Sequence, residues 1–266
     1  MLSVRKLFLD IHDNDEAFQL LCTLTAAGRA CCGGESERIA ALVTDPELAH
    51  RITRHGDEEN EHARVFHTLL RGRGLEAAQL CADLDYMAQL EERGLGFPHD
   101  RLRDDAQTLC EEDVIAYLSR SRVTEQRGAA ELRLMQKALA ERPEVHRALT
   151  SVTRGEARHL AYAQEELLRL ADGDRRRSAL VRRSLRRTAL AEIRVHRDVS
   201  LAMMSRMGAI LGWSWTRRRL LTFSIRMAYL FERCGGWRRL TSLRMPPPGR
   251  RTVLGRPAAA GPRGRR

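Results

Sequence analysis

The sequence predicts an all-α fold, and two observations lead to that prediction. Aromatic residues make up only 5% of the 266 residues, and Val and Ile are sparse beside Leu, Ala, Arg and Glu. Such a composition favours helices over the strands of a sandwich or a barrel. Apolar residues also recur at helical spacing, as in the segment that contains Phe18, Leu21 and Leu24. The hydrophobic content of 43% is that of an ordinary globular protein.

Four long helices are expected in the first two thirds of the chain. Their expected ranges are 13–42, 46–70, 104–141 and 143–170. Asp45 suits the N-cap of the second helix and Pro46 its first helical position, and Pro143 opens the fourth helix in the same style. A further, shorter helix is expected over 75–93, between the second and third long helices.

The expected connections between these helices indicate their arrangement. The first and second helices are joined by a short turn near 44–45, and the third and fourth by a short turn near 141–142. Some thirty residues separate the second helix from the third. Two tight hairpins joined by one long crossover form a known topology of the four-helix bundle.

The charge of the chain divides it into two parts. Residues 174–266 contain 24 arginines, no lysine and four acidic residues, a net charge of +20. The whole chain carries +11, so residues 1–173 carry −9. This contrast predicts a helical bundle over 1–173 and a basic helical extension over 174–245, with a boundary near Gly173. The Pro, Gly, Arg and Ala content of 246–266 predicts a disordered tail.

The basic extension is expected to form amphipathic helices. Residues 175–197 predict a strongly basic helix, followed by apolar segments at 201–215 and 220–231 with tryptophans near their ends. These helices can pack on the acidic body, or residues 175–240 can bind an anionic membrane surface. A nucleic-acid partner is the least favoured of the three interpretations, because no known reading motif is present.

An internal repeat aligns acidic residues with histidines. A shift of 97 residues places Glu59 and His62 on Glu156 and His159, each pair behind a helix-opening proline. A Glu-x-x-His pair lies on one face of a helix, where both side chains can bind the same metal ion or neighbouring ions. Glu125 stands 31 residues before Glu156, where the third helix is expected to supply a single carboxylate.

This set of motifs resembles the ferritin-like di-iron carboxylate superfamily, in its rubrerythrin-like and related oxidase branches, over roughly residues 10–172. The resemblance depends on five residues, namely Glu59, His62, Glu125, Glu156 and His159. It implies a ferritin-like four-helix bundle in which these residues bind iron or manganese, with Glu59 and His62 on one ion and Glu156 and His159 on the other. It also implies oxidase- or oxygenase-type redox chemistry on a small-molecule substrate, with dioxygen or peroxide.

The first helix departs from this pattern, because the repeat places Gly28 where a fourth carboxylate is expected. Glu35 lies near the same face but about 10 Å along the helix axis. Cys31 and Cys32 are one turn away, and a kink at the two following glycines can bring Glu35 closer. Three glutamates supply −3 against the +4 of two divalent ions, so one or two ions are expected, the second held more weakly.

The missing carboxylate keeps a non-enzymatic alternative open. A bundle without redox chemistry can act as an interaction or membrane-surface module through its basic extension. No residue is assigned as a general acid or base. His55 is expected at the surface or in packing, with outer support of a metal as the lesser alternative, and Glu58 and Glu61 are expected to face solvent.

The six cysteines show no CxxC pair and no zinc-site spacing, so we expect reduced thiols in a cytoplasmic protein. The first ten residues contain too short an apolar run for a signal peptide, and no apolar stretch of about 18 residues predicts a membrane span. The membrane interpretation of the extension therefore implies a peripheral location. A homodimer is a further open alternative.

Overall fold

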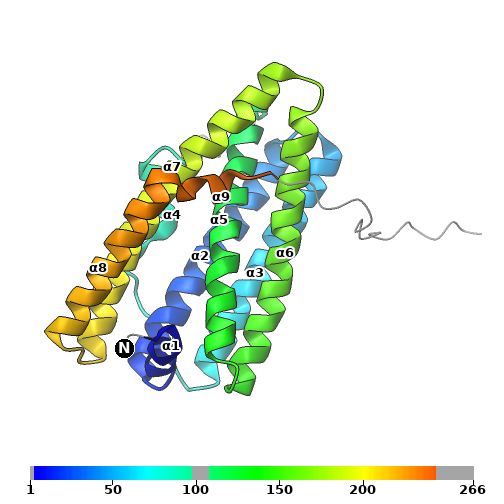
Figure 1. The fold of residues 1–266 in the computed structure, drawn as a ribbon. Coiled ribbons are helices and arrows are strands. Elements are labelled where there is room, and N and C mark those ends of the chain that lie inside the picture. The colour runs from blue at the N-terminus through cyan, green and yellow to red at the C-terminus, as the bar shows by residue number, and fades with distance from the viewer. Residues whose placement is uncertain (1–2, 98–107, 244–266) are drawn as a thin grey trace, which may run out of the picture.

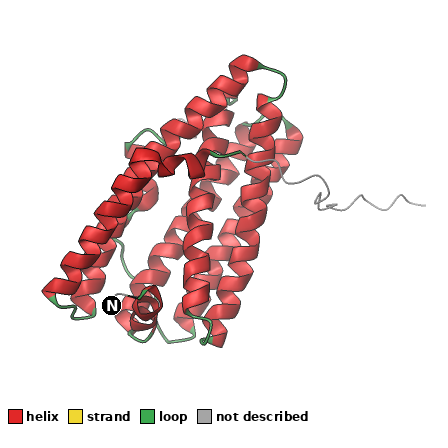
Figure 2. Cartoon of the chain, viewed as in Figure 1, coloured by secondary structure: helices red, strands yellow, loops and turns green. Residues whose placement is uncertain are grey.

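The computed structural model describes residues 3–97 and 108–243, and the regular structure of these residues is entirely helical (Figures 1 and 2). The all-α prediction is therefore confirmed. The helices are α1 (Val4–His12), α2 (Asp15–Leu42), α3 (Pro46–Arg71), α4 (Tyr86–Glu92), α5 (Glu111–Ala138), α6 (Pro143–Ala171), α7 (Arg175–Ile210), α8 (Trp215–Phe231) and α9 (Trp237–Thr241). A 3-10 turn, η1 (Ala82–Leu84), precedes α4, and a π-helical turn, η2 (Glu232–Gly236), precedes α9.

Two hairpins of long helices form the body of the protein. The helices α2 and α3 pack along each other, as do α5 and α6, and α3 contacts α6. Figure 1 shows these helices side by side, with α7 crossing α5 and α8 at the edge of the molecule. The segment between α3 and α5 contains η1 and α4, and α4 packs on α7.

The expected helix starts agree with the structure where a side chain caps the helix. The Asp45 carboxylate accepts hydrogen bonds from the backbone N–H groups of Glu47 and Leu48 at 3.0 and 3.2 Å, and Pro46 is the first residue of α3. The Asp174 carboxylate caps α7 in the same way. Gly173, just before it, has a φ of +69°, a left-handed conformation that ends a helix readily only at glycine.

The prediction of a helix over 75–93 is wrong for the first half of that range. Residues 75–81 form no helix, because their backbone groups pair with α2. The Ala78 N–H donates to Thr23 Oγ1 at 3.0 Å, and the Gln19 amide donates to the Glu76 carbonyl at 2.8 Å. Only η1 and α4 remain helical, and the Asp85 side chain caps α4.

Other differences concern an additional helix, the length of two helices and an expected kink. The structure adds α1, which the sequence analysis did not expect, and α7 runs unbroken to Ile210, past the boundary expected near 197–201. The kink considered at Gly33 is absent, since α2 is continuous. The helix expected over 104–141 is shorter in the structure, where α5 begins at Glu111 and ends at Ala138, and residues 108–110 are not helical. Residues 104–107 of that helix and the tail expected to be disordered over 246–266 lie outside the described residues.

The core consists of two large apolar clusters that lie at different heights of the same four long helices. One cluster lies at the end of the bundle where α2 starts, and the other lies at the opposite end, where α2 stops. Buried polar side chains separate the two clusters. The first cluster includes Phe18, Phe66, Leu132 and Leu149, and the second includes Ile39, Ile52, Leu118 and Leu167.

Glycines allow α2 and α3 to approach closely beside these polar side chains. A Cβ atom on Gly56 of α3 would lie 3.0 Å from the backbone oxygen of Gly33 and 3.0 Å from Ser36 Cβ, both on α2. A Cβ atom on Gly33 would overlap the side chain of Asn60. The close packing of α2 on α3 therefore depends on Gly56, whose Cβ would meet backbone, whereas a side chain at position 33 would require Asn60 to move.

We expect Gly56→Ala to lower the free energy of unfolding relative to Gly28→Ala, the matched control. A Cβ atom on Gly28 meets no atom within 4 Å, so this variant gains helix propensity of about 1 kcal/mol without a clash. Overpacking at Gly56 should make the difference between the two variants about 1–3 kcal/mol. Urea denaturation followed by circular dichroism measures it, and equal stability of the two variants would contradict the close approach.

Candidate metal centre

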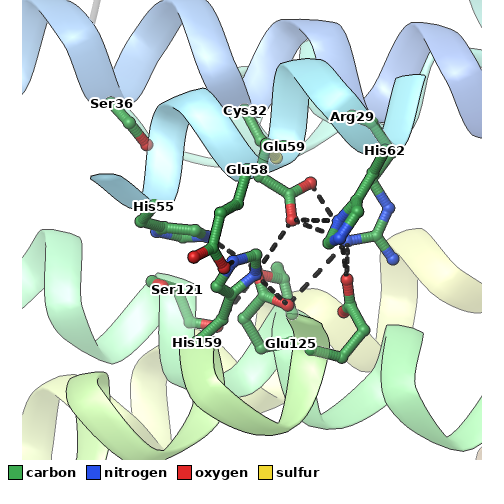
Figure 3. A network of polar contacts seen from close by, with 12 residues as sticks. Arg29, Cys32, Ser36, His55, Glu58, Glu59, His62, Ser121, Glu125 and His159 are labelled. Carbon is green, nitrogen blue, oxygen red and sulfur yellow. Dashed lines mark hydrogen bonds and ion pairs between the residues drawn. The ribbon is translucent and has the colours of Figure 1, made fainter. Parts of the chain in front are cut away.

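The buried polar side chains between the two apolar clusters form one group, which we call the polar layer. It consists of Arg29, His55, Glu59, His62, Glu125, Glu156 and His159. Three long helices supply the five residues that the sequence analysis named, with Glu59 and His62 on α3, Glu125 on α5, and Glu156 and His159 on α6. All five are buried, at most 7% exposed, and the structure brings all five together (Figure 3).

Each Glu-x-x-His pair lies on the inward face of its helix, as the spacing predicts. Glu59 Oε1 lies 3.2 Å from His62 Nδ1 and 3.0 Å from His159 Nδ1. Glu156 Oε1 lies 3.4 Å from His62 Nδ1. One potential ligand atom from each of these four residues lies within 4.8 Å of the others. The two pairs thus face each other across the α3–α6 interface.

A glycine makes room for this arrangement on α6. A Cβ atom on Gly155 would overlap the imidazole ring of His62, so the ring lies directly against the α6 backbone. Gly155 immediately precedes Glu156, and the sequence analysis gave it no role. A glycine beside a candidate ligand on an otherwise good helix is a signal that could have indicated a close helix approach.

His55, one turn before Glu59, belongs to a second group of potential ligands. Its Nε2 lies 3.1 Å from Glu125 Oε1, and its Nδ1 lies 3.0 Å from the hydroxyl of Tyr162. One atom each from His55, Glu59, Glu125 and His159 lies within 4.8 Å of the others. His55 is therefore buried within the polar layer, and its expected surface position is wrong.

Arg29 lies where the sequence left the fourth carboxylate missing. Its Nη1 is 3.0 Å from both carboxylate oxygens of Glu59 and 2.5 Å from Glu156 Oε1, and 3.9 Å from Glu125 Oε2 (Figure 3). The arginine side chain is only 13% exposed. A Cβ atom on Gly128 of α5 would lie 3.1 Å from Arg29 Nη2, so this glycine leaves space for the guanidinium.

The alternatives considered for the missing carboxylate lie elsewhere. Glu35 is buried and pairs with the buried Arg120 of α5, so it does not replace the ligand. Cys31 is exposed, and Cys32 Sγ lies 3.8 Å from Met87 Sδ. Neither cysteine joins a group of potential metal ligands among the described residues.

A carboxylate outside the polar layer orients His159. Glu58 Oε2 lies 2.9 Å from His159 Nε2 and accepts a hydrogen bond from Arg158 at 3.0 Å. The expectation that Glu58 simply faces solvent is therefore wrong. When a carboxylate holds the proton of one ring nitrogen, the other nitrogen presents its lone pair. His159 Nδ1 is the nitrogen that would present its lone pair to a bound ion, and Figure 3 shows it facing Glu59 and Glu125. Without an ion, burial opposes the charged form of His159, but hydrogen bonds with Glu58 and Glu59 outweigh it and raise its pKa, which favours a proton on this nitrogen.

Burial and mutual attraction shift the pKa values of the polar layer. Burial alone would lower the pKa of Arg29, but Glu156, Glu59 and Glu125 outweigh it and keep it well above its ordinary value. Burial also opposes the charged form of His62, yet hydrogen bonds with Glu156 and Glu59 raise its pKa to about 9. Burial, with the neighbouring His159, lowers the pKa of His55 to about 3, so this ring is neutral.

The carboxylates separate into charged and protonated forms. Burial raises the pKa of Glu125 well above its ordinary value, and the charges of Glu156 and Glu59 add to this effect. Burial opposes ionisation of Glu156 as well, but Arg29 and His62 lower its pKa to about 2. Glu59 and Glu156 are therefore ionised and paired with cations, whereas Glu125 has no compensating cation and favours its protonated form.

The polar layer has donor atoms that suit a divalent metal ion. Glu125 Oε2, Glu156 Oε2 and His159 Nδ1 are buried and make no hydrogen bond of acceptable geometry. Buried polar atoms without partners are rare, because each costs about 1–3 kcal/mol. Imidazole nitrogens and carboxylate oxygens are ligands of iron, manganese and zinc. The residues present therefore fit a bound metal ion.

We expect Arg29→Met to destabilise the chelator-treated protein strongly. The substitution leaves buried carboxylates without their cation, which typically costs about 3–5 kcal/mol. Arg64→Met is the matched control, because Arg64 and its partner Glu61 are 64% and 67% exposed and such pairs contribute about 0–1 kcal/mol. Denaturant titration with EDTA present measures both variants. Similar losses in the two variants would show that Arg29 does not compensate buried charge.

Comparisons of the chain with protein families, with curated proteins and with solved structures gave no match. The functional argument therefore depends on the geometry of the polar layer itself. Its seven side chains combine three carboxylates, three imidazoles and one guanidinium at the centre of a bundle of long helices.

Proposed function

We propose that the polar layer binds one divalent transition metal ion, iron or manganese, through His55, Glu59, Glu125 and His159. The observation that supports this proposal most directly is the position of the Arg29 guanidinium. Its Nη1 is within hydrogen-bonding distance of Glu156, which belongs only to the other ligand group, and of Glu59, which belongs to both groups. Arg29 thus stands in the place of a second cation.

The geometry favours the half of the polar layer that contains His55. Arg29 Nη1 is 3.9 Å from Glu125 Oε2, compared with 2.5 Å from Glu156 Oε1. Glu125 Oε2 and His159 Nδ1 lack hydrogen-bond partners in this half. The carboxylates of Glu59 and Glu125 supply −2 towards one divalent ion, while Arg29 and His62 are the cations beside Glu156. Two imidazoles and two carboxylates make a complete set of four ligands.

Residues around the proposed ligands would hold them in place. Tyr162 contacts His55 Nδ1 and lies 3.5 Å from the hydroxyl of Tyr117, which in turn lies 3.0 Å from Ser36 Oγ. Glu58 orients His159 from the other side. These contacts fix the ring orientations and therefore which nitrogens face the metal position. Apolar clusters above and below the layer exclude water from it.

The resemblance to ferritin-like di-iron proteins extends the proposal to redox chemistry. Iron or manganese bound here would supply one-electron chemistry towards dioxygen or peroxide. The departure at Gly28 and the presence of Arg29 favour a single ion over the pair of that superfamily. The protein's own residues would bind the ion, orient the imidazoles and keep the layer dry.

We expect the chelator-treated protein, reloaded anaerobically with Fe(II) or Mn(II) and dialysed, to retain one ion per chain. Glu125→Gln removes a ligand and should abolish retention, whereas Glu61→Gln, on the exposed face of α3, should not change it. Glu58→Gln should weaken binding about 10–100-fold, because it loosens His159. Arg29→Gln should raise the capacity to two ions. Mass-spectrometric metal analysis of the dialysed protein gives the stoichiometry.

Two outcomes of this experiment count against the proposal in different ways. Retention by wild-type protein no greater than by Glu125→Gln would show that the polar layer holds no metal. Two ions per wild-type chain would keep the metal centre but contradict the substitution of Arg29 for the second cation.

A second candidate function, binding to an anionic membrane surface, is favoured by the exposed face of α8. This helix buries none of its residues. Six of its large apolar residues are 46–64% exposed, whereas α7 buries apolar residues along its length, from Val181 to Met207. The exposed apolar residues of α8 and its last turn are Trp215, Leu220, Phe223, Met227, Leu230 and Phe231.

The charge of α8 suits this surface. The helix has four arginines and no acidic residue, and the Arg219 guanidinium lies 4.0 Å from the centre of the Trp215 ring. Basic and aromatic side chains beside an apolar stripe are typical of helices that lie in the plane of an anionic bilayer surface. Within 3–97 and 108–243, no helix combines the length and apolar character needed to span a bilayer.

We expect the protein to float with vesicles that contain phosphatidylserine and much less with phosphatidylcholine vesicles alone. The double variant Phe223→Glu/Leu230→Glu should lose this flotation, because both substitutions place acids on the apolar stripe. Val4→Glu, at a side chain of α1 that is 51% exposed, is the control and should float like wild type. Equal flotation of the double variant, or of wild type with both vesicle types, would contradict the proposal.

A further inference from the structure

A largely apolar cavity of about 450 Å³ lies beside the polar layer, between α2 and α5 and below α7. Helix α1, η1 and α4 contribute to its walls. Its volume is within the range of small-molecule sites in proteins. Leucines and methionines are the most frequent lining residues, among them Leu21, Leu24, Leu84, Met87, Met135 and Met203.

The cavity meets the polar layer at Gly28. Arg29 and Glu125 both line the cavity, and Gly28 and Gly128 lie beside them. A Cβ atom on Gly28 would meet no atom within 4 Å, so the position faces open space. The carboxylate that the repeat predicts at this position would enter the cavity. Its replacement by glycine therefore opens a passage from the apolar cavity to the candidate metal ligands.

The two arginines at the inner end of the cavity already have partners. Arg29 pairs with Glu59 and Glu156, and Arg127 forms hydrogen bonds of 2.8–2.9 Å with Glu192 and Glu232. In the metal-free protein, an anionic group of a ligand would therefore find both arginines at this end already paired. Exposed lining residues, such as Glu131 and Leu134, lie at the solvent side. A polar head group is therefore best placed at the mouth, with an apolar end directed inward.

We propose that this cavity binds the hydrocarbon chain of an aliphatic ligand, such as a fatty acid, with its terminal carbons against Gly28. Flexible methionine and leucine side chains adapt to the shape of a bent hydrocarbon chain. An apolar cavity stays dry and gains free energy when an apolar ligand fills it. The position of the chain end relative to a metal ion rests on the proposed function, whereas binding of the chain does not require a metal.

The first test is titration of chelator-treated protein with cis-parinaric acid, a fluorescent fatty acid, followed by displacement with dodecanoate. Saturable binding to wild type is expected. Gly28→Leu fills the inner end and should weaken binding at least tenfold, and Ser200→Phe should weaken it from the α7 wall. Gly34→Leu is the matched control, because Gly34 lies on α2 outside the cavity lining and its Cβ would contact only the flexible Arg38 side chain.

The exposed face of α8 is a second place where a fatty acid can bind. The Phe223→Glu/Leu230→Glu variant removes that surface and should leave the titration unchanged. Three outcomes would each overturn the proposal, whatever the metal analysis shows. They are absence of saturable binding by wild type, an affinity of both cavity-filling variants equal to that of wild type, and loss of binding in the α8 variant.

The orientation of the chain is tested separately with Mn(II)-loaded protein. Paramagnetic broadening in the nuclear magnetic resonance spectrum of bound dodecanoate should be greater for the terminal methyl than for the protons next to the carboxylate. Loading is first verified by metal analysis, so a failure of the metal proposal is recognised before this step. Greater broadening at the carboxylate end of loaded protein would overturn the proposed orientation.

Discussion

The carboxylates of Glu59, Glu125 and Glu156 impose the strongest constraint on the interior of this protein. They meet at the centre of a bundle of long helices, between two apolar clusters, and are almost completely buried from solvent. Like charges at such a site must be offset by cations or neutralised by protons. Arg29, the imidazoles and the raised pKa of Glu125 are the ways in which the chain meets this requirement.

The packing of the helices follows from this central layer. Glycine at position 155 allows the His62 ring to lie against α6, and glycine at 128 leaves space for Arg29. Gly33 and Gly56 let α2 and α3 approach closely at the same height. A larger residue at position 155 would displace the His62 ring, and one at position 56 would meet the backbone of α2. The apolar clusters at either end hold the layer in register, and the ionic contacts within it define which side chains meet.

Arg29 has a double effect on the proposed chemistry. In the proposed centre its guanidinium would take the place of a second cation, and the glycine before it would account for the carboxylate missing beside that cation. The same change opens the adjacent cavity to the ligand residues. Two neighbouring residues, Gly28 and Arg29, are therefore the basis for proposing a centre with one ion beside an apolar cavity. The basic extension divides in a similar way, since α7 is packed into the body and α8 presents apolar and basic side chains outward.

The sequence by itself determined the all-α fold, the starts of α3 and α6, and the five acidic and histidine residues that come together. These features follow from local rules, because prolines and capping residues set helix starts and a three-residue spacing places two side chains on one face. It did not determine the roles of His55, Arg29 and Glu58, or the non-helical path of 75–81. Each of these depends on a partner distant in sequence, such as Glu125 for His55, Glu156 for Arg29 and Thr23 for Ala78. Only tertiary packing decides such pairs, since burial converts an ordinary arginine or histidine into a group that must find an opposite charge.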